Sequence, residues 1–526
     1  MPARAQLQDA SLRPAQGPLP LSRWARALLV AAAVWALVSL AASVAHRIAY
    51  PYDLEWMEGA MLAHALRVAE GRPLYAPPSL EFVSFAYVPV YPAVVALLSR
   101  GFGLGYVLAR AVSLGGFALA LAAAYAFLRA ERSPREIALA GVALPAAAFA
   151  PTGARFDLAR LDSLFLGLAA AGLVLAWRGR HRDGAAVASA LVLAAAFFTK
   201  QTAAPLIVVA AVALRLADRR RGSIFMATLL VAGGTAFALL QARTDGWFAT
   251  YAFGLHQRHA FDTRAALLVT PLRVGLLLGP GLALVPWAWR TRRSSALAYA
   301  LALAAAGLAA SVLGAGTEWA YNNALIPAVY FGGLAIAMAA GRLATSPASG
   351  RAAWVAPLAT ALSIVSAAGG LVWIADRVRP AAGLGLPVGY DPRPLWPSAE
   401  DRARGDALVA RLRAEPGGVF VPFHPFYPHL AGKPTSLHAM NLADLSRADL
   451  GTPRDLVDAI RNRTLGLIVL DEEDGPAPED ERTRQALDQF PRLAGHYEVV
   501  ERIDGPRVFS GAPVRPRLLL RPRPRP

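Results

Sequence analysis

The sequence has no cysteine and almost no lysine. Without cysteine the protein has neither disulfide bonds nor thiolate chemistry. Of its 53 basic residues only Lys200 and Lys433 are lysine, so nearly every positive charge is the guanidinium group of an arginine. The sequence also contains no internal repeat and no glycine-rich loop of the kind that cradles phosphates, which argues against direct nucleotide binding.

Charged residues are scarce and apolar residues abundant. Of the 526 residues, 56% are hydrophobic and 17% are charged, which leaves too little polar surface for a soluble protein of this length. Many apolar runs approach or exceed the ~18–20 residues that span a bilayer. The net charge of +17 would suit nucleic acid, but the arginines lie in short clusters between apolar runs, as membrane topology requires. We therefore expect a polytopic α-helical membrane protein and no nucleic-acid partner.

The arginine clusters orient the apolar runs. Basic loops stay on the cytoplasmic side, so we expect the N-terminal tail, residues 1–26, inside and the loop after the first span outside. The first run lacks a convincing cleavage site and is expected to be retained as a span. About eleven spans are predicted, at residues 27–46, 105–128, 137–151, 163–177, 184–198, 202–216, 223–241, 267–289, 296–313, 324–340 and 352–374. They form a membrane domain over 27–374, with a long first outer loop at 47–104.

The composition changes after the last predicted span. Proline and glycine cluster through residues 375–400, which we interpret as a linker. Residues 401–514 are predicted to form a small extracytoplasmic α/β domain, and residues 515–526 a disordered Arg/Pro tail. The expected helices are 401–414, 455–463 and 482–490, and the expected strands are 418–423, 464–470, 497–503 and 507–510.

Three carboxylates stand within six residues directly after the first span. Asp53, Glu55 and Glu58 follow Tyr52 in a stretch that also carries Trp56. Acids so close to a bilayer are costly unless they are solvated or used. Two interpretations stay open: a solvated loop that carries charge, or a catalytic base with a helper.

Polar side chains recur in the other predicted outer loops, so five separate segments offer charge to one membrane face. The second loop, residues 152–162, carries Arg155, Asp157, Arg160 and Asp162; Lys200 and Gln201 end the fifth span; His256 and His259 lie in the fourth loop, and Glu318 and Tyr321 in the fifth. The predicted substrate contacts are Tyr52, His64, Asp157, Asp162, Gln201, Glu318 and Tyr321.

This mixture of acids and cations suits the transfer of a sugar from a lipid phosphate. The leaving phosphate gains negative charge, which arginine and lysine stabilise, so Arg155, Arg160 and Lys200 are predicted to bind it. A carboxylate within hydrogen-bond reach accepts the proton of the attacking hydroxyl. In the alternative interpretation, the two arginines pair with Asp157 and Asp162 and merely seal their loop.

The outer-loop residues resemble a known family. The acids after the first span, the segments 71–75, 85–92, 155–162 and 199–202, and Arg110 together are similar to GT-C membrane glycosyltransferases. The resemblance covers residues 25–340 and is nearest to bacterial protein O-mannosyltransferases and the lipid A aminoarabinose transferase. It implies a bacterial inner-membrane enzyme that uses a polyprenyl-phosphate sugar and inverts the anomeric centre.

The resemblance also implies that an aspartate of the first outer loop is the base, often beside a glutamate. Here Met57 precedes Glu58, and the other two acids lie upstream. We favour Asp53 as the base, followed by Glu58 and then Glu55.

No cofactor is assigned from the sequence. Candidate positions for a divalent metal are His256 with His259 and the acidic run 471–474, but no third ligand is evident at the first and a solvated turn is favoured at the second. His424, His429 and His438 are interpreted as surface or acceptor-facing residues.

The predicted function is that of a hexosyl- or pentosyltransferase acting at the cell envelope. Its partners would be a polyprenyl-phosphate-linked sugar, membrane lipid, and a glycan, lipid or protein acceptor. Two alternatives stay open: a transporter or flippase of a lipid-linked sugar, and a non-catalytic scaffold whose outer domain binds a partner.

Overall fold

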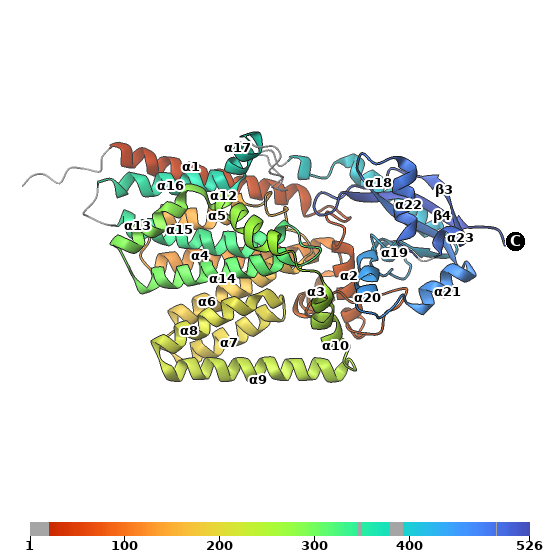
Figure 1. Cartoon of the computed structure of the whole chain (residues 1–526), viewed down its shortest axis with the longest axis horizontal. Helices are drawn as coiled ribbons and strands as arrows, with labels where there is room; N and C mark the ends of the chain where they lie inside the picture. Colours follow the sequence, from red (N-terminus) through yellow and green to blue (C-terminus); the bar gives the residue numbers. More distant parts are fainter. Residues whose placement is uncertain (1–19, 346–349, 379–392, 491, 526) are drawn as a thin grey trace, which may run out of the picture.

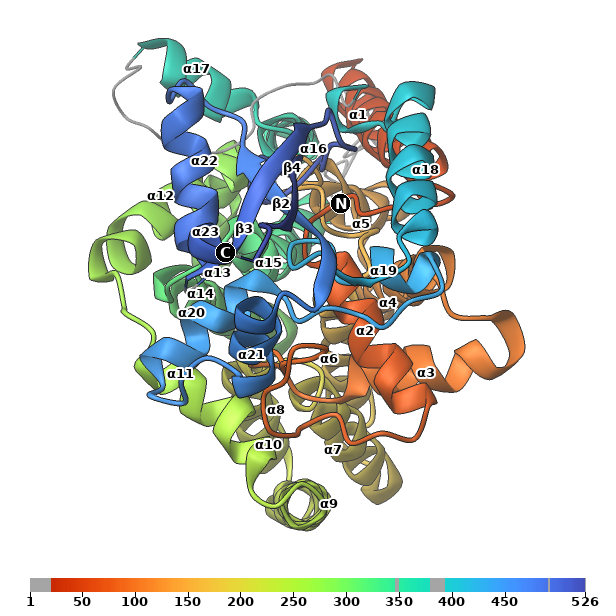
Figure 2. The same cartoon turned by 90° about the vertical axis from the view of Figure 1, so that its right-hand side faces the viewer.

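The protein consists of a long helical bundle with a smaller sheet domain at one end (Figure 1). This computed structural model describes residues 20–345, 350–378, 393–490 and 492–525. Most of the N-terminal tail, residues 1–19, and the centre of the predicted linker, residues 379–392, lie outside the described residues. In the end-on view of Figure 2 the sheet domain lies in front of the bundle.

Every predicted span coincides with helical structure. Among the described residues, seven helices are long and apolar enough to cross a membrane, and shorter apolar helices accompany them. The bundle contains α1 (Pro20–Arg47), α4 (Tyr106–Ala130), α5 (Arg135–Ala147), α6 (Leu161–Arg178), α7 (Asp183–Phe197), η1 (Gln201–Ala203), α8 (Ala204–Ala217), α9 (Arg219–Arg243), η3 (Ala265–Val269), α12 (Thr270–Leu278), η4 (Gly279–Ala283), α13 (Leu284–Thr291), α14 (Ser295–Gly316), η5 (Asn322–Leu325), α15 (Ile326–Ala344) and α16 (Ala352–Ala367).

The last predicted span, 352–374, is not one continuous helix. α16 ends at Ala367, and α17 (Gly370–Val378) begins after Gly369, whose φ is +99°. Glycine adopts this left-handed backbone without a steric penalty and so ends the helix. The structure therefore divides the predicted span 352–374 into two helices.

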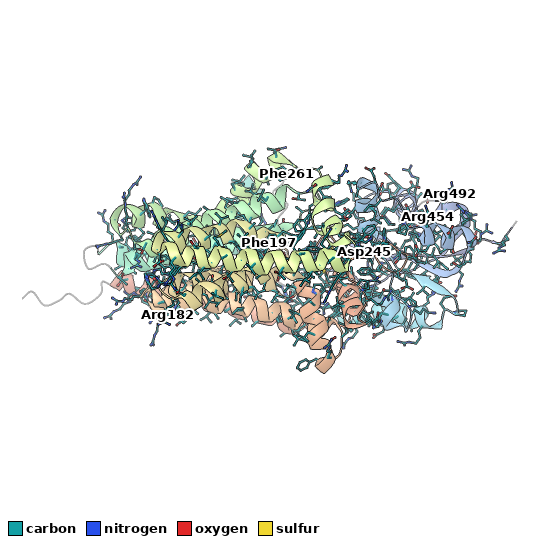
Figure 3. All side chains as sticks on the ribbon, turned by 90° about the horizontal axis from the view of Figure 1, so that it is seen from below. Arg182, Phe197, Asp245, Phe261, Arg454 and Arg492 are labelled. Carbon is teal, nitrogen blue, oxygen red and sulfur yellow. The ribbon has the colours of Figure 1, made fainter. Side chains whose placement is uncertain are left out.

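The chain alternates between the two ends of the bundle. Figure 3 places Arg182, beside the start of α7, at the end far from the sheet domain, and Asp245, just after α9, at the near end. Small residues let the helices approach closely. A Cβ on Gly167 of α6 would lie 2.2 Å from the carbonyl oxygen of Gly116 in α4. α15 is buried along nearly its whole length and forms the centre of the bundle.

Short helices cover the end of the bundle that faces the sheet domain (Figure 1). They are α2 (Glu58–Ala69), α3 (Val90–Phe102), α10 (Trp247–Ala249), η2 (Thr250–Gly254), α11 (Leu255–Arg258) and η7 (Arg393–Leu395). α2 is the amphipathic helix that follows the acidic stretch, and its apolar residues Met61, Leu62 and Ala65 are buried.

The C-terminal domain is an α/β unit with a four-stranded sheet in the order β1-β2-β4-β3. β1 and β2 are parallel, and β4 is antiparallel to both β2 and β3. Its elements are α18 (Ala399–Ala414), β1 (Gly418–Phe420), α19 (Tyr427–Leu430), α20 (Ala439–Arg447), α21 (Arg454–Asn462), β2 (Leu465–Glu473), α22 (Glu479–Asp488), α23 (Leu493–His496), β3 (Tyr497–Arg502) and β4 (Val514–Pro522).

The prediction of a disordered C-terminal tail was wrong. Residues 514–522 form the interior strand β4, and Leu518, Leu519 and Leu520 are completely buried. Arg517 pairs with Asp504 at 2.8 Å, and Arg515 pairs with the same residue at 2.7 Å. Acids elsewhere in the domain thus neutralise arginines that suggested disorder. Residues 507–510 form no strand; within the described residues Ser510 makes an isolated bridge to Glu55 instead.

Candidate functional site

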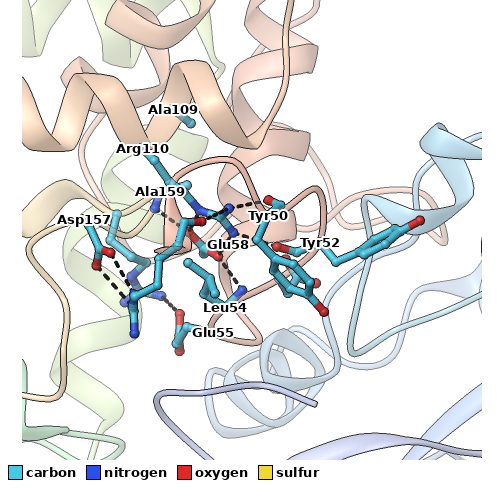
Figure 4. Close-up of polar contacts among 12 residues, drawn as sticks. Tyr50, Tyr52, Leu54, Glu55, Glu58, Ala109, Arg110, Asp157 and Ala159 are labelled. Atoms are coloured by element: carbon cyan, nitrogen blue, oxygen red, sulfur yellow. Dashed lines mark hydrogen bonds and ion pairs between the residues drawn. The ribbon is translucent and has the colours of Figure 1, made fainter. Parts of the chain in front are cut away.

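Glu58, in the first turn of α2, is a buried structural hub. Arg110 of α4 donates two parallel hydrogen bonds to it, Nε to Oε1 at 3.0 Å and Nη2 to Oε2 at 2.7 Å (Figure 4). The backbone N–H groups of Leu54 and Ala159 donate to its two oxygens, each at 2.6 Å. Burial alone would raise the pKa of Glu58, but Arg110 and the backbone donors hold it below its usual range. Four donors fill the acceptor capacity of this carboxylate.

Asp53 takes part in a second buried network, with two residues of the C-terminal domain. Its Oδ2 lies 2.6 Å from Nδ1 of His424, and Nε2 of His424 lies 2.9 Å from Oδ2 of Asp471 in β2. All three side chains are buried. Burial raises the pKa of Asp53 to about 6, against the opposing effect of His424. Burial lowers the pKa of His424, but the two carboxylates outweigh it and raise the pKa to about 10.

This network corrects two interpretations of the C-terminal domain. His424 is completely buried and is not a surface residue. The acidic run 471–474 is not a solvated turn: Asp471 is buried against His424, and Glu472 is buried and pairs with Arg502 at 2.9 Å. The structure shows no group of three or more potential metal ligands among the residues it describes.

Three predicted substrate-binding residues serve packing instead. Asp157 accepts hydrogen bonds from Arg47 at 2.7 and 3.1 Å, both side chains being fully buried. The Tyr52 hydroxyl donates to Asp406 of α18 at 2.5 Å. Nδ1 of His64 lies 2.6 Å from the carbonyl oxygen of Ala60, and Nε2 of the same ring accepts a hydrogen bond from the Phe85 N–H at 2.9 Å. None of the three lines the cavity between the bundle and the C-terminal domain that is described next.

A cavity of about 520 Å³ lies between the outer end of the bundle and the C-terminal domain. It brings together most of the remaining predicted residues, contributed by the second, third, fourth and fifth outer loops. Its polar lining includes Tyr87, Arg155, Arg160, Asp162, Lys200, Gln201, His256, His259, Glu318, Tyr321, Asn323 and Asp444. Asp53, Glu55 and Glu58 are not part of this lining.

Arg155 and Arg160 form the cationic wall of the cavity. Arg155 is 1% exposed, and none of its three guanidinium nitrogens has a hydrogen-bond partner in the described part of the chain. Its Nη2 lies 3.6 Å from Oε1 of Glu55, and its guanidinium group lies over the ring of Tyr321. Arg160 lies 3.4 Å from Oε2 of Glu55 and donates to the Tyr87 hydroxyl at 3.1 Å. The alternative in which these arginines pair with Asp157 and Asp162 is not what the structure shows, because both arginines lie within ion-pair distance of Glu55 instead.

Lys200 and Asp162 form another polar part of the cavity lining. Lys200 Nζ donates to Asp162 Oδ1 at 2.5 Å, and the Asn323 amide donates to the same oxygen at 3.0 Å. Oδ2 of Asp162 has no partner among the described residues. Gln201 donates to the carbonyl oxygen of Ala252 at 2.9 Å. A buried oxygen left free in this way is available to a ligand hydroxyl.

The C-terminal domain closes the rim of the cavity, which the sequence did not indicate. Asp444 and Met440 of α20 are part of the lining. His259 Nε2 lies 2.9 Å from Asp444 Oδ1, and Arg447 donates to Glu318 at 2.6 Å. No local pattern marks these residues, because α20 is nearly two hundred positions from the loop it meets.

Comparison with known proteins adds a fold relationship. No family model and no curated protein matches the chain. Among solved structures, the chain is similar to ArnT from Cupriavidus metallidurans bound to undecaprenyl phosphate, with a TM-score of 0.57 and 16% identity over 95% of this chain and 98% of that chain. The apo state of ArnT gives a TM-score of 0.56 with the same identity and coverage. This likeness confirms the resemblance at the level of the fold: the chain has the overall fold of ArnT, a helical bundle with a small sheet domain at one end.

Proposed function

We propose that this protein is a GT-C glycosyltransferase that moves a sugar from a polyprenyl-phosphate carrier to an acceptor hydroxyl with inversion. The undecaprenyl phosphate bound by the similarly folded ArnT supports a carrier of this kind. In the proposed orientation the N-terminus lies in the cytoplasm of a bacterium and the cavity opens on the outer side of the inner membrane. The sugar is a hexose or pentose, and the acceptor is a glycan, a lipid or a protein.

The unsatisfied guanidinium group of Arg155 carries this proposal. Buried donors without acceptors destabilise a fold, so their persistence at a cavity wall indicates an anionic ligand. Arg160 and Lys200 line the same cavity. Arginine matches two phosphate oxygens at once, which suits recognition of a lipid phosphate.

The reaction exchanges one bond at the anomeric carbon. The acceptor oxygen attacks the anomeric carbon while the bond between that carbon and the phosphate oxygen breaks. The electrons of the broken bond leave with the phosphate. Arg155, Arg160 and Lys200 stabilise the charge that develops on the phosphate. A carboxylate accepts the proton of the acceptor hydroxyl.

Glu55 is the carboxylate that the geometry favours as this base: it does not line the cavity itself, but it contacts Arg155 and Arg160, which do. Glu58 already accepts four hydrogen bonds, and Asp53 is held by His424. The contacts of Glu55 with Arg155 and Arg160, at 3.6 and 3.4 Å, are longer than good charged hydrogen bonds. A phosphate that binds both arginines accepts hydrogen bonds from their N–H groups, which then no longer face Glu55. Oε1 of Glu55 is thereby left free to accept a proton. Binding of the polyprenyl-phosphate sugar thereby prepares Glu55 to act as the base.

The test compares Glu55→Gln with Glu70→Gln in proteoliposomes that contain a polyprenyl-phosphate sugar. Glu70 is an exposed acid at the end of α2 and serves as the matched control. We expect Glu55→Gln to reduce sugar transfer by about 10²- to 10⁴-fold, the usual contribution of a general base, and Glu70→Gln to leave it unchanged.

The products separate this function from its alternatives. A transferase releases free polyprenyl phosphate together with the glycosylated acceptor, whereas a flippase returns the donor intact. Full transfer by Glu55→Gln would remove Glu55 from the role of base. Translocation of intact donor with no release of polyprenyl phosphate would overturn the assignment as a transferase.

A further inference from the structure

The C-terminal domain holds the acidic stretch of the first outer loop through His424. This imidazole lies between Asp53, which follows the first span, and Asp471, at the end of β2, with distances of 2.6 and 2.9 Å. The ring also stacks on Tyr427, with centroids 4.9 Å apart. A buried charge keeps its place only where its partners are fixed, so this bridge ties the loop to the sheet.

A second segment of the domain, residues 509–511, contacts both loops that build the cationic wall. The Phe509 N–H donates to the Leu54 carbonyl oxygen at 2.7 Å, and Ser510 makes a parallel bridge to Glu55. The Ser510 hydroxyl donates to the carbonyl oxygen of Gly153, two residues before Arg155. We call residues 509–511 the strap.

Gly511 shows how tightly the strap lies against Glu55. Its φ is +83°, and a Cβ added there would lie 2.9 Å from Oε1 of Glu55 and 3.3 Å from the ring of Trp56. Only glycine combines this backbone conformation with so close an approach. The strap therefore limits where the Glu55 carboxylate can lie.

We propose that the C-terminal domain is a working part of the active site, in which His424 and the strap position Glu55 against Arg155 and Arg160. This inference rests on the proposed function for its consequence in catalysis. His424 does not line the cavity and touches no reacting atom, so it is a positioning residue. Asp53 is the residue of the first outer loop to which His424 binds, and in this proposal it is not the base.

Two variants test the bridge in the full-length protein. His424→Gln keeps a donor for one carboxylate but cannot reach both. Asp53→Asn with His424→Gln replaces the anchor by an amide pair that retains a hydrogen bond and leaves Asp471 as the one carboxylate of the bridge, where the single variant leaves two. The matched control is Arg411→Ala, which breaks an exposed ion pair with Glu501 in the same domain.

Kinetics distinguish positioning from simple anchoring. We expect His424→Gln to lower kcat at least tenfold while the KM for the donor changes less than threefold, because the phosphate-binding cations stay. The double variant should recover at least fivefold over His424→Gln. An unchanged kcat in folded His424→Gln would overturn the proposal, as would a double variant no more active than His424→Gln.

Hydrogen exchange supplies a readout that needs no substrate. We expect faster exchange in residues 53–58 and 153–160 of His424→Gln and no change in Arg411→Ala. If His424→Gln fails to fold, Ser510→Ala tests the strap in the same way, because it removes only the hydroxyl contact with Gly153. Unaltered exchange in both loops would overturn the proposal. If the wild-type protein transfers no sugar but His424→Gln still shows faster exchange in both loops, only the proposed function is contradicted.

Discussion

The clusters around Glu58 and Glu55 begin three residues apart, yet their buried charges are satisfied in opposite ways. Glu58 accepts two hydrogen bonds from Arg110 and two from backbone N–H groups, so no oxygen is left over. Glu55 meets Arg155 and Arg160 at 3.4 to 3.6 Å, and the guanidinium nitrogens of Arg155 have no hydrogen-bond partner within the described residues. The first cluster is closed and the second is open.

The difference separates a structural use of charge from a functional one. A closed cluster repays the cost of burying its ions with complete hydrogen bonding. An open cluster leaves donors unmet, and each costs about 1–3 kcal/mol until a ligand arrives. Only the open cluster faces the cavity, through Arg155 and Arg160. Stability should therefore depend on Glu58, and ligand binding on Arg155.

The largest expected effect comes from breaking the closed cluster. Glu58→Gln leaves Arg110 buried without its counter-ion, and removing one partner of a buried pair typically costs about 3–5 kcal/mol. We expect a matching loss in the free energy of unfolding in detergent, measured by thermal denaturation. Arg155→Met removes three nitrogen donors that have no hydrogen-bond partner within the described residues and leaves Glu55 paired with Arg160, so it should cost much less stability. Equal losses in the two variants would contradict the division into closed and open clusters.

The His424 bridge should make stability depend on pH. Its folded-state pKa of about 10 exceeds the usual value of 6.5, so the folded protein retains one proton more than the unfolded chain between these values. Stability from this bridge is complete below pH 6.5 and falls as the pH rises towards 10, by about 1.4 kcal/mol per unit. We expect a loss of about 3 kcal/mol between pH 7 and pH 9 at that slope, and a flatter curve for His424→Gln.

Three other buried groups with shifted pKa values, Asp53, His64 and His438, titrate outside this window. The raised pKa of Asp53, about 6, stabilises the fold only at more acidic pH, and that contribution is lost as the pH rises through 6. Burial lowers the pKa of His64 to about 4 and that of His438 to about 3, so their effects also end by about pH 6.5. A wild-type curve as flat as that of His424→Gln between pH 7 and 9 would show that His424 is not protonated in the fold.

A substitution in the open cluster should weaken the binding of the lipid phosphate. Arg155→Gln removes the charge and the fork of donors, and we expect the affinity for undecaprenyl phosphate to fall tenfold to a hundredfold, or about 1.4–2.8 kcal/mol. Binding is measured by titration of the lipid into purified protein in nanodiscs. Arg264→Gln, an exposed arginine of the fourth outer loop, is the control and should bind as the wild type does. Equal affinity in the Arg155 variant would remove the argument that carries the proposed function.

The overall architecture was accessible from the sequence because its signals are local. Apolar runs and the arginines between them predict each helical segment of the bundle, and the apolar stripe after Gly59 predicts α2. β4 was missed because arginine and proline dominate its composition. Its arginines find acids in other segments, Asp474 and Asp504, and its leucines are covered by β2 and β3.

The roles of the three acids were not accessible in the same way. Asp53, Glu55 and Glu58 share one short stretch, and nothing in their spacing distinguishes them. Their partners do: His424 lies 371 positions from Asp53, and Arg110 lies 52 positions from Glu58. Such long-range pairs leave no periodic pattern in the sequence. The residue types alone identified the three acids as a group, and only the folded structure shows that their environments differ.

The smallest expected effect concerns the rim of the cavity, where Arg447 of the C-terminal domain meets Glu318 at 2.6 Å. Both side chains are partly exposed, and Arg447 also lies over the ring of Trp319. Water screens such a pair, so Arg447→Ala should cost less than about 1 kcal/mol of stability. Because this contact closes α20 over the cavity, we expect KM for the acceptor to rise about twofold, in line with that small energy, while kcat stays unchanged. A loss of kcat as large as that of Glu55→Gln would mean that a half-exposed rim contact controls the chemistry, and the distinction between closed, open and rim charges would then have no functional meaning.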